Sequence, residues 1–111
     1  MTGIADMEGK RFRRPGDTSG AVAVYHEDGD VVWAVVEGGE VRRGSVTGNR
    51  AADGVLRMGY TIVLASGEII CGFSVSTPEV TEQGVLRLRE EWERFGLHAA
   101  SGVSYIEEVV R

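Results

Sequence analysis

Pairs of turn-forming residues that end in glycine recur along the chain at short intervals. They are Asp28-Gly29, Gly38-Gly39, Asp53-Gly54, Ser66-Gly67 and Gln83-Gly84. Glycine reaches the positive φ angles that tight hairpin turns require, and each pair separates two runs rich in β-branched, aliphatic or aromatic residues. Short extended runs between closely spaced turns are typical of an antiparallel all-β meander.

Eight extended runs lie between the turns, and they predict a single domain over residues 1–111. The runs span residues 8–14, 21–27, 30–37, 39–48, 54–65, 68–77, 84–94 and 100–110, and residues 1–7 are expected to form a flexible N-terminus. Eight short antiparallel strands can form a sandwich or a closed barrel. Because closure removes exposed sheet edges, we predict an all-β fold, an eight-stranded antiparallel up-and-down barrel.

The segment from Val85 to Leu97 is ambiguous between helix and strand. As a helix it would carry an apolar stripe formed by Val85, Leu88, Trp92 and Phe95. Its content of Leu, Arg and Glu also favours a helix. As a strand it would direct one carboxylate, that of Glu90, to the same face as its apolar side chains. Local pattern alone leaves both structures open.

Charge and composition exclude several classes of partner. The chain has a formal net charge of −5, so we expect neither nucleic acid nor an anionic membrane surface as a partner. The longest apolar run, Val31 to Val36, is far below the ~20 residues of a membrane helix. No apolar stretch follows the basic residues near the N-terminus, as it would in a secretory signal. We therefore expect a cytoplasmic protein.

Few residues could bind a metal or a phosphate-bearing cofactor. Cys71 is the only cysteine, and the two histidines, His26 and His98, have no ligand neighbours at metal-binding spacing. The segment Arg42 to Gly48 is basic and rich in glycine, but it has neither P-loop nor dinucleotide spacing. We predict a strand with a glycine bulge there, no metal site and no cofactor.

Closure of the barrel would gather polar and aromatic side chains in its interior. Alternation along the strands predicts that a small-molecule site is lined by Tyr25, Tyr60, Ser76, Glu90, Trp92, Ser104 and Glu108. A mostly apolar pocket with a few converging polar groups is typical of such sites, and an eight-stranded barrel is wide enough for one small ligand. The alternative is a filled barrel, in which the aromatic residues are ordinary core groups with one hydrogen bond each.

Glu90 is the candidate with the clearest chemistry. A carboxylate among Leu88, Trp92 and other inward groups loses water, which raises its pKa unless a donor pairs with it. Such a group can bind a hydrogen-bonding ligand or act as a general acid or base together with Tyr60 or Glu108. It can equally hydrogen-bond to Tyr60 or an arginine and hold the strands together.

Several short motifs resemble, in the same order, those of a known family. They are Tyr25 before an Asp-Gly turn, Gly38-Gly39-Glu40-Val41 with Gly44, Tyr60, Ser76-Thr77-Pro78-Glu79, Leu88-Arg89-Glu90-Glu91-Trp92 and Ser101-Gly102-Val103-Ser104-Tyr105-Ile106-Glu107-Glu108. This family of small bacterial proteins often carries the label N-acetylglutamate synthase. The resemblance implies a small β-barrel of the lipocalin-like or avidin-like type and favours a strand over residues 85–94.

Three functions remain open at this point. The chain shows no glycine-rich turn from a strand into a helix, where acetyl-CoA enzymes bind the cofactor pyrophosphate, so the residues favour a small-molecule binding protein. The second function is an enzyme that uses Glu90 as an acid or base. The third is an interaction module with a filled barrel. It would use an outward apolar stripe as a homodimer surface, formed by Ile69, Cys71, Phe73 and Val75.

Overall fold

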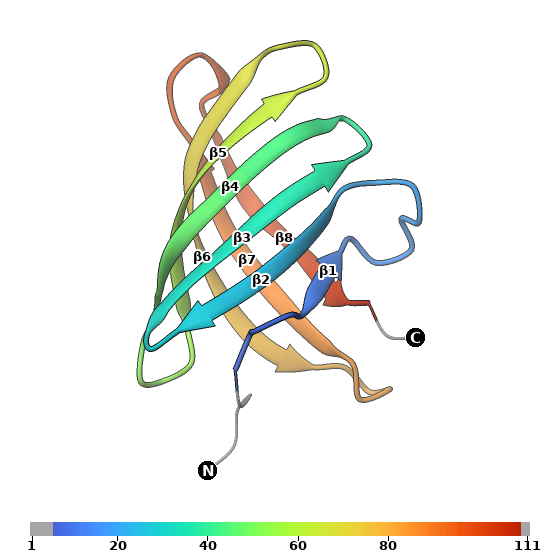
Figure 1. The fold of residues 1–111 in the computed structure, drawn as a ribbon, viewed down its shortest axis with the longest axis vertical. Helices are drawn as coiled ribbons and strands as arrows, with labels where there is room; N and C mark the ends of the chain where they lie inside the picture. Colours follow the sequence, from blue (N-terminus) through green and yellow to red (C-terminus); the bar gives the residue numbers. More distant parts are fainter. Residues whose placement is uncertain (1–5, 110–111) are drawn as a thin grey trace.

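A computed structural model describes residues 6–109 and shows a closed barrel of eight antiparallel strands (Figure 1). Each strand pairs with the next along the chain, and the first also pairs with the last. The strands are β1 (Arg11–Arg13), β2 (Val22–Asp28), β3 (Val31–Gly38), β4 (Val41–Arg50), β5 (Leu56–Leu64), β6 (Ile69–Val80), β7 (Leu86–Arg94) and β8 (Ala100–Glu108). This confirms the predicted all-β up-and-down barrel.

Strand β7 resolves the ambiguity of the segment 85–97. Its nine residues pair with β6 on one side and with β8 on the other, so a helix is wrong for this segment. Tertiary contacts outweigh the local helix propensity of this segment. As a strand it buries Leu86 and Leu88 and forms backbone hydrogen bonds with a neighbouring strand on each side. A short 3₁₀ turn, Gly96–His98, follows β7. Among residues 6–109, no helix is long and apolar enough to cross a membrane.

Strand β1 is shorter than the predicted run 8–14 and closes the barrel. Arg11 and Phe12 pair with β2, and Phe12 and Arg13 pair with β8. The basic segment from Lys10 to Arg14 therefore does not form a sheet edge. Because β1 lies between β2 and β8, its backbone groups form hydrogen bonds on both sides and leave no exposed edge.

Strand β6 extends past Pro78, beyond the predicted end at Thr77. The pairing of β6 with β5 stops at Ser76, whereas its pairing with β7 continues to Val80. Beyond Ser76 the strand therefore has a single neighbour, as an edge strand has. Proline, which lacks an N–H, is tolerated at such a position.

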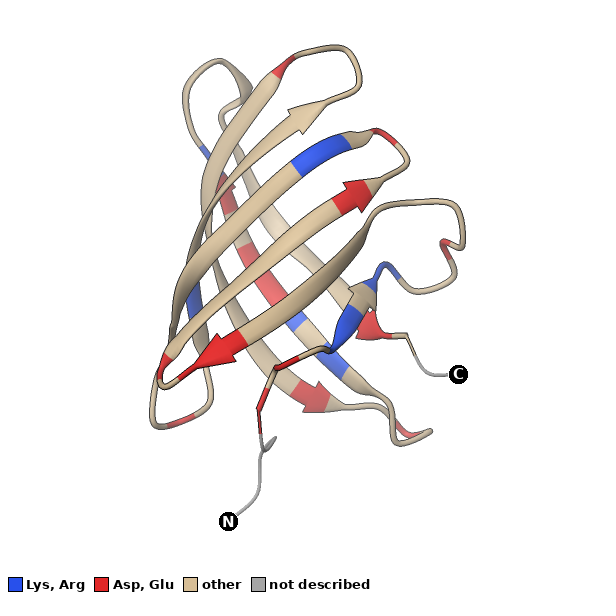
Figure 2. Cartoon of the chain, in the orientation of Figure 1, with Lys and Arg blue, Asp and Glu red and all other residues tan. Residues whose placement is uncertain are grey.

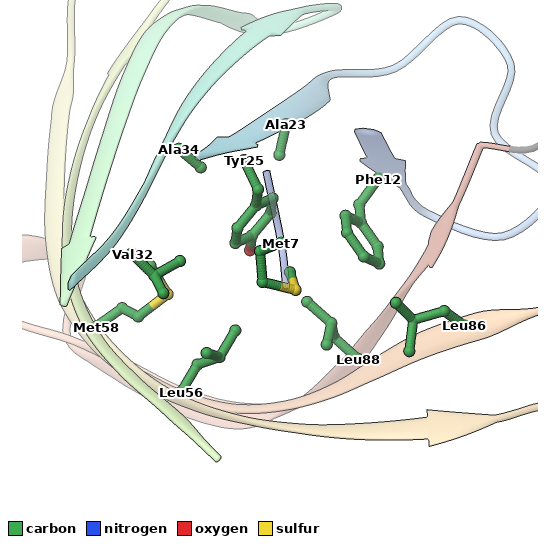
Figure 3. Packing of buried hydrophobic residues seen from close by; sticks show 10 residues of the cluster. All are labelled: Met7, Phe12, Ala23, Tyr25, Val32, Ala34, Leu56, Met58, Leu86 and Leu88. Atoms are coloured by element: carbon green, nitrogen blue, oxygen red, sulfur yellow. The ribbon is translucent and has the colours of Figure 1, made fainter. Parts of the chain in front are cut away.

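An apolar core fills the end of the barrel next to the β2–β3, β4–β5 and β6–β7 turns (Figure 3). Its fully buried apolar members are Met7, Phe12, Val32, Leu56, Met58 and Leu88. The prediction of a flexible segment over residues 1–7 is thus wrong for Met7, whereas residues 1–5 lie outside the described part of the chain. Met7 N–H donates to Glu27 Oε1 at 2.7 Å, and Arg50 Nε donates to Glu27 Oε2 at 2.9 Å. These bonds hold the N-terminal segment across this end.

Strands β4 and β5 approach closely at Gly48, which pairs with Met58. A Cβ at Gly48 would lie 1.9 Å from the carbonyl oxygen of Arg57. Only glycine fits this approach without a shift of backbone. The predicted glycine bulge in this segment is not at Gly48: the irregular register lies between Val41 and Arg43.

We expect Gly48→Ala to lower the free energy of unfolding by about 1–3 kcal/mol or more, because the new methyl group overlaps backbone that cannot move independently. Gly59→Ala is the matched control in β5, since the nearest atom to its Cβ would be Gly72 O at 3.9 Å. That variant should shift stability by less than about 1 kcal/mol. Urea unfolding of the two variants measures the difference, and equal effects would contradict the close approach.

Candidate functional site

The opposite end of the barrel, next to the β1–β2, β3–β4, β5–β6 and β7–β8 turns, contains a cavity of about 190 Å³. Its apolar walls are formed by Ala23, Val36, Val46, Ile62 and Ile106. Its polar and aromatic lining is formed by Tyr25, Tyr60, Ser74, Glu90, Trp92 and Ser104, with Arg14 and Arg94. The barrel is therefore filled at one end and hollow at the other.

Two glycines shape the aromatic walls of the cavity. Gly72 pairs with Tyr60 across β5 and β6, and a Cβ on Gly72 would lie 2.4 Å from the Tyr60 hydroxyl oxygen. Gly102 pairs with Trp92 across β7 and β8, and a Cβ there would lie 2.8 Å from the indole ring. In each pair the ring lies against bare backbone of the neighbouring strand. The missing side chains leave room for the rings beside the central space.

Glu90 projects from the middle of β7 into this cavity. Its Oε2 accepts a hydrogen bond from Ser76 Oγ at 3.4 Å. Burial raises the pKa of Glu90 to about 7, and the hydrogen bond from Ser76 and the charge of Arg14 oppose this shift only in part. The expectation of a perturbed inward carboxylate fits this geometry. At neutral pH the group is present in both protonated and ionised forms.

Three hydroxyl groups face the cavity without a hydrogen-bond partner among the described residues: those of Tyr25, Ser74 and Ser104. Tyr25 is only 3% exposed, and burial, followed by the charge of Glu90, raises the pKa of its phenol. It therefore stays protonated and can donate. Tyr60 differs, because its hydroxyl donates to the carbonyl oxygen of Glu93 at 3.1 Å. Polar atoms left free in a cavity are available to a ligand.

Two arginines of the cavity were not among the predicted site residues. Arg94 follows Glu90 and Trp92 on the inward face of β7, and its guanidinium carbon lies 5.2 Å from the centre of the Trp92 ring. Arg14 follows Phe12 with the same parity just after β1. Each is the last residue of a predicted run, 8–14 or 84–94, two positions after an inward residue. Continuing the alternation to the ends of these runs would have predicted both as inward residues.

The predicted site residues separate into two groups in the structure. Tyr25, Tyr60, Glu90, Trp92 and Ser104 line the cavity together. Ser76 is fully buried and joins them only through its hydrogen bond to Glu90.

Glu108 does not share the cavity with Glu90. It lines a separate hollow beside the β1–β2 loop, and its Oε2 lies 3.9 Å from Lys10 Nζ. The structure thus does not bring together the two carboxylates that an acid–base pair would need. Tyr60 shares the cavity, but its hydroxyl donates to backbone.

The outer surface of β6 carries the apolar stripe that the alternation predicts. Ile69 and Phe73 are 57% and 41% exposed, and Cys71 is an exposed free thiol. Their outward direction confirms that Gly72, Ser74 and Ser76 point inward. Within residues 6–109, no group of three His, Cys, Asp or Glu side chains could hold a metal ion.

Comparison with known proteins gives a family and no individual relative. A sequence model of the family described as Avidin-like protein matches residues 5–109 of the chain. No curated protein and no solved structure matches the chain significantly.

The burial of Glu90 predicts a pH-dependent cost to stability. Its folded-state pKa of about 7 lies above the ordinary value of 4.5, so the folded protein holds a proton that the unfolded chain has released. The free energy of unfolding therefore falls as pH rises from about 4.5 to about 7. A glutamine at this position does not ionise, so Glu90→Gln should keep its stability as pH rises. We expect its free energy of unfolding to exceed that of the unsubstituted protein by about 1–3 kcal/mol at about pH 8.

Urea unfolding at about pH 4 and about pH 8 tests this effect, since the difference should nearly vanish at the lower value, where Glu90 is largely protonated in both states. Glu93→Gln is the matched control, because its side chain is exposed on the outer face of the same strand. A stability difference between Glu90→Gln and the unsubstituted protein that does not vary with pH would contradict the burial of an ionisable group.

Proposed function

The chain belongs to the avidin-like family, and we propose that it is a binding protein for a small organic molecule, which it holds in the hollow end of its barrel. The family match supports this proposal through the fold, because an eight-stranded barrel offers space for one ligand. The observation that carries it is the cavity of about 190 Å³ in which three hydroxyl groups and one carboxyl group converge.

The arrangement of the cavity suits binding through shape and hydrogen bonds. Aliphatic side chains and the rings of Tyr60 and Trp92 provide an apolar surface for the body of a ligand. The hydroxyls of Tyr25, Ser74 and Ser104 can each donate or accept a hydrogen bond. Glu90 accepts when ionised and donates when protonated. The cavity is smaller than the ~300–1,000 Å³ of pockets for drug-sized molecules, so the ligand is small.

A rigid lining supports binding without a large rearrangement. Every wall residue except Arg14 lies on a strand that pairs with neighbours on both sides, and Tyr60 is fixed by its bond to the Glu93 carbonyl. A preformed site loses little conformational entropy when a ligand enters.

We expect a thermal-unfolding screen of small organic molecules to find compounds that raise Tm by about 5 °C or more at ten times Kd, because a ligand that binds only the folded state stabilises it. In a Trp33→Phe background, the same compounds should change the fluorescence of Trp92, the remaining indole, at the cavity wall.

A matched pair of substitutions on β8 gives the control. Ser104→Leu fills the cavity and should weaken binding at least about tenfold, whereas Ser101→Leu places the same side chain on the exposed outer face and should leave it unchanged. If no compound raises Tm, or if Ser104→Leu binds as well as Ser101→Leu, the proposed function is wrong.

A further inference from the structure

We propose that the molecule held in this cavity is a small organic anion, whose acidic group lies between Arg14 and Arg94 while its apolar body extends into the barrel. This inference rests on the proposed function and names the chemical class of its ligand. It follows from the distribution of charge inside the barrel rather than from the barrel shape.

The two cavity arginines lack carboxylate partners. Several other arginines are paired with carboxylates: Arg43 with Glu37, Arg50 with Glu27, Arg87 with Glu79 and Arg89 with Glu91. Among residues 6–109, neither Arg14 nor Arg94 has a carboxylate oxygen within ion-pair distance. The charge of Arg14 acts on Glu90 from a greater distance, and Arg94 lies against neutral side chains, the Trp92 ring and the Tyr60 hydroxyl. Two guanidinium groups in one cavity that no carboxylate contacts directly favour an anion there.

The excess of positive charge is local. The whole chain has a formal net charge of −5, and basic and acidic residues follow one another along β7 (Figure 2). Among residues 6–109, Glu90 is the only carboxylate that lines the cavity, together with the two arginines Arg14 and Arg94. Its protonation near neutral pH reduces the negative charge that an anionic ligand would meet. The cavity is therefore positive in an otherwise acidic protein.

Arg94 is held in a position suited to recognition of an oxyanion. Its guanidinium stacks over the Trp92 ring at 5.2 Å and lies beside the Tyr60 hydroxyl, where its charge opposes the effect of burial on the Tyr60 pKa. A planar guanidinium offers paired N–H donors to a carboxylate or phosphate. Because the indole already restrains this side chain, less conformational entropy is lost when an anion binds.

The aliphatic part of the cavity lining indicates the chemistry of the ligand's remaining part, away from its acidic group. The same cavity that the arginines and the hydroxyl groups line has aliphatic walls formed by Val36, Val46, Ile62 and Ile106. An inorganic anion would leave this apolar surface uncovered, whereas an organic anion covers it. The geometry thus favours one acidic group on a short apolar body.

Phenylacetate, phenylacetamide and 2-phenylethylamine test the inference, because they share one apolar body and differ in charge. Calorimetric titration at about pH 6 keeps the carboxylate probe ionised while Glu90 is largely protonated. We expect phenylacetate to bind at least about tenfold more tightly than phenylacetamide, and the amine to bind most weakly. Phenyl phosphate, as a fourth probe, shows which of the two acid groups the arginines prefer.

Three substitutions assign the effect to the cavity. Arg94→Gln and Arg14→Gln should each reduce the preference for phenylacetate over phenylacetamide by about threefold or more, and Arg94→Lys should restore part of it. Arg57→Gln removes the same charge from the exposed outer face of β5 and should leave the preference unchanged. Thermal unfolding of each variant confirms that it folds.

The outcomes separate this inference from the proposed function. Equal binding of phenylacetate and phenylacetamide would overturn the inference that the ligand is an anion, and the protein would then be a binding protein for neutral molecules. Failure of phenylacetate and phenyl phosphate to bind at millimolar concentration would also overturn it, whereas the proposed function stands or falls by its own screen. Competition by inorganic phosphate as strong as that by phenylacetate would overturn the organic part of the inference.

Discussion

Closure of the sheet by β1 is the constraint on which the rest of the structure depends. Three residues, Arg11–Arg13, pair with β2 on one side and with β8 on the other. Without them the sheet would have two exposed edges and no enclosed interior. With them, every inward side chain faces a space that must be filled by protein or left for another molecule. The ion pair of Glu27 with Arg50 and the bond from Met7 N–H reinforce closure at the filled end.

The two ends of the interior differ because of the size of their side chains. At the filled end, Met7 and Phe12 enter from the N-terminal segment and pack with aliphatic residues of β3, β5 and β7. At the hollow end, the inward positions of β6 and β8 hold glycine and serine instead. Gly72 and Gly102 let aromatic rings of the neighbouring strands lie against backbone. Small inward residues next to large aromatic ones thus make a cavity with firm walls.

Glu90 connects the stability of the barrel with the chemistry of its cavity. An inward carboxylate at this depth costs folding free energy at neutral pH, and an amide at the same position would not. Proteins commonly keep such destabilising groups where a function requires them. Arg14 and Arg94, which no carboxylate contacts directly, reinforce this interpretation, since the three groups together make the hollow end strongly polar. At the filled end, by contrast, the charges of Glu27 and Arg50 are paired directly with each other.

The sequence by itself determined the fold and the direction of its side chains. Glycine turns at short intervals predicted eight strands, and alternation with period two correctly placed Tyr25, Glu90 and Trp92 inside. It left residues 85–97 between helix and strand, because local propensity and strand pairing favour different structures there. It also missed Met7, whose burial depends on a contact with a distant part of the chain.

Only the tertiary structure decided the depth at which each inward residue lies. Glu108 has the parity of Ser104 and Ile106, yet it lines a different hollow. Arg14, just after β1, and Arg94, the last residue of β7, line the cavity. The physical reason is that alternation fixes the face of a strand. Register and the tilt of strands around the barrel fix which residues of different strands meet at one level.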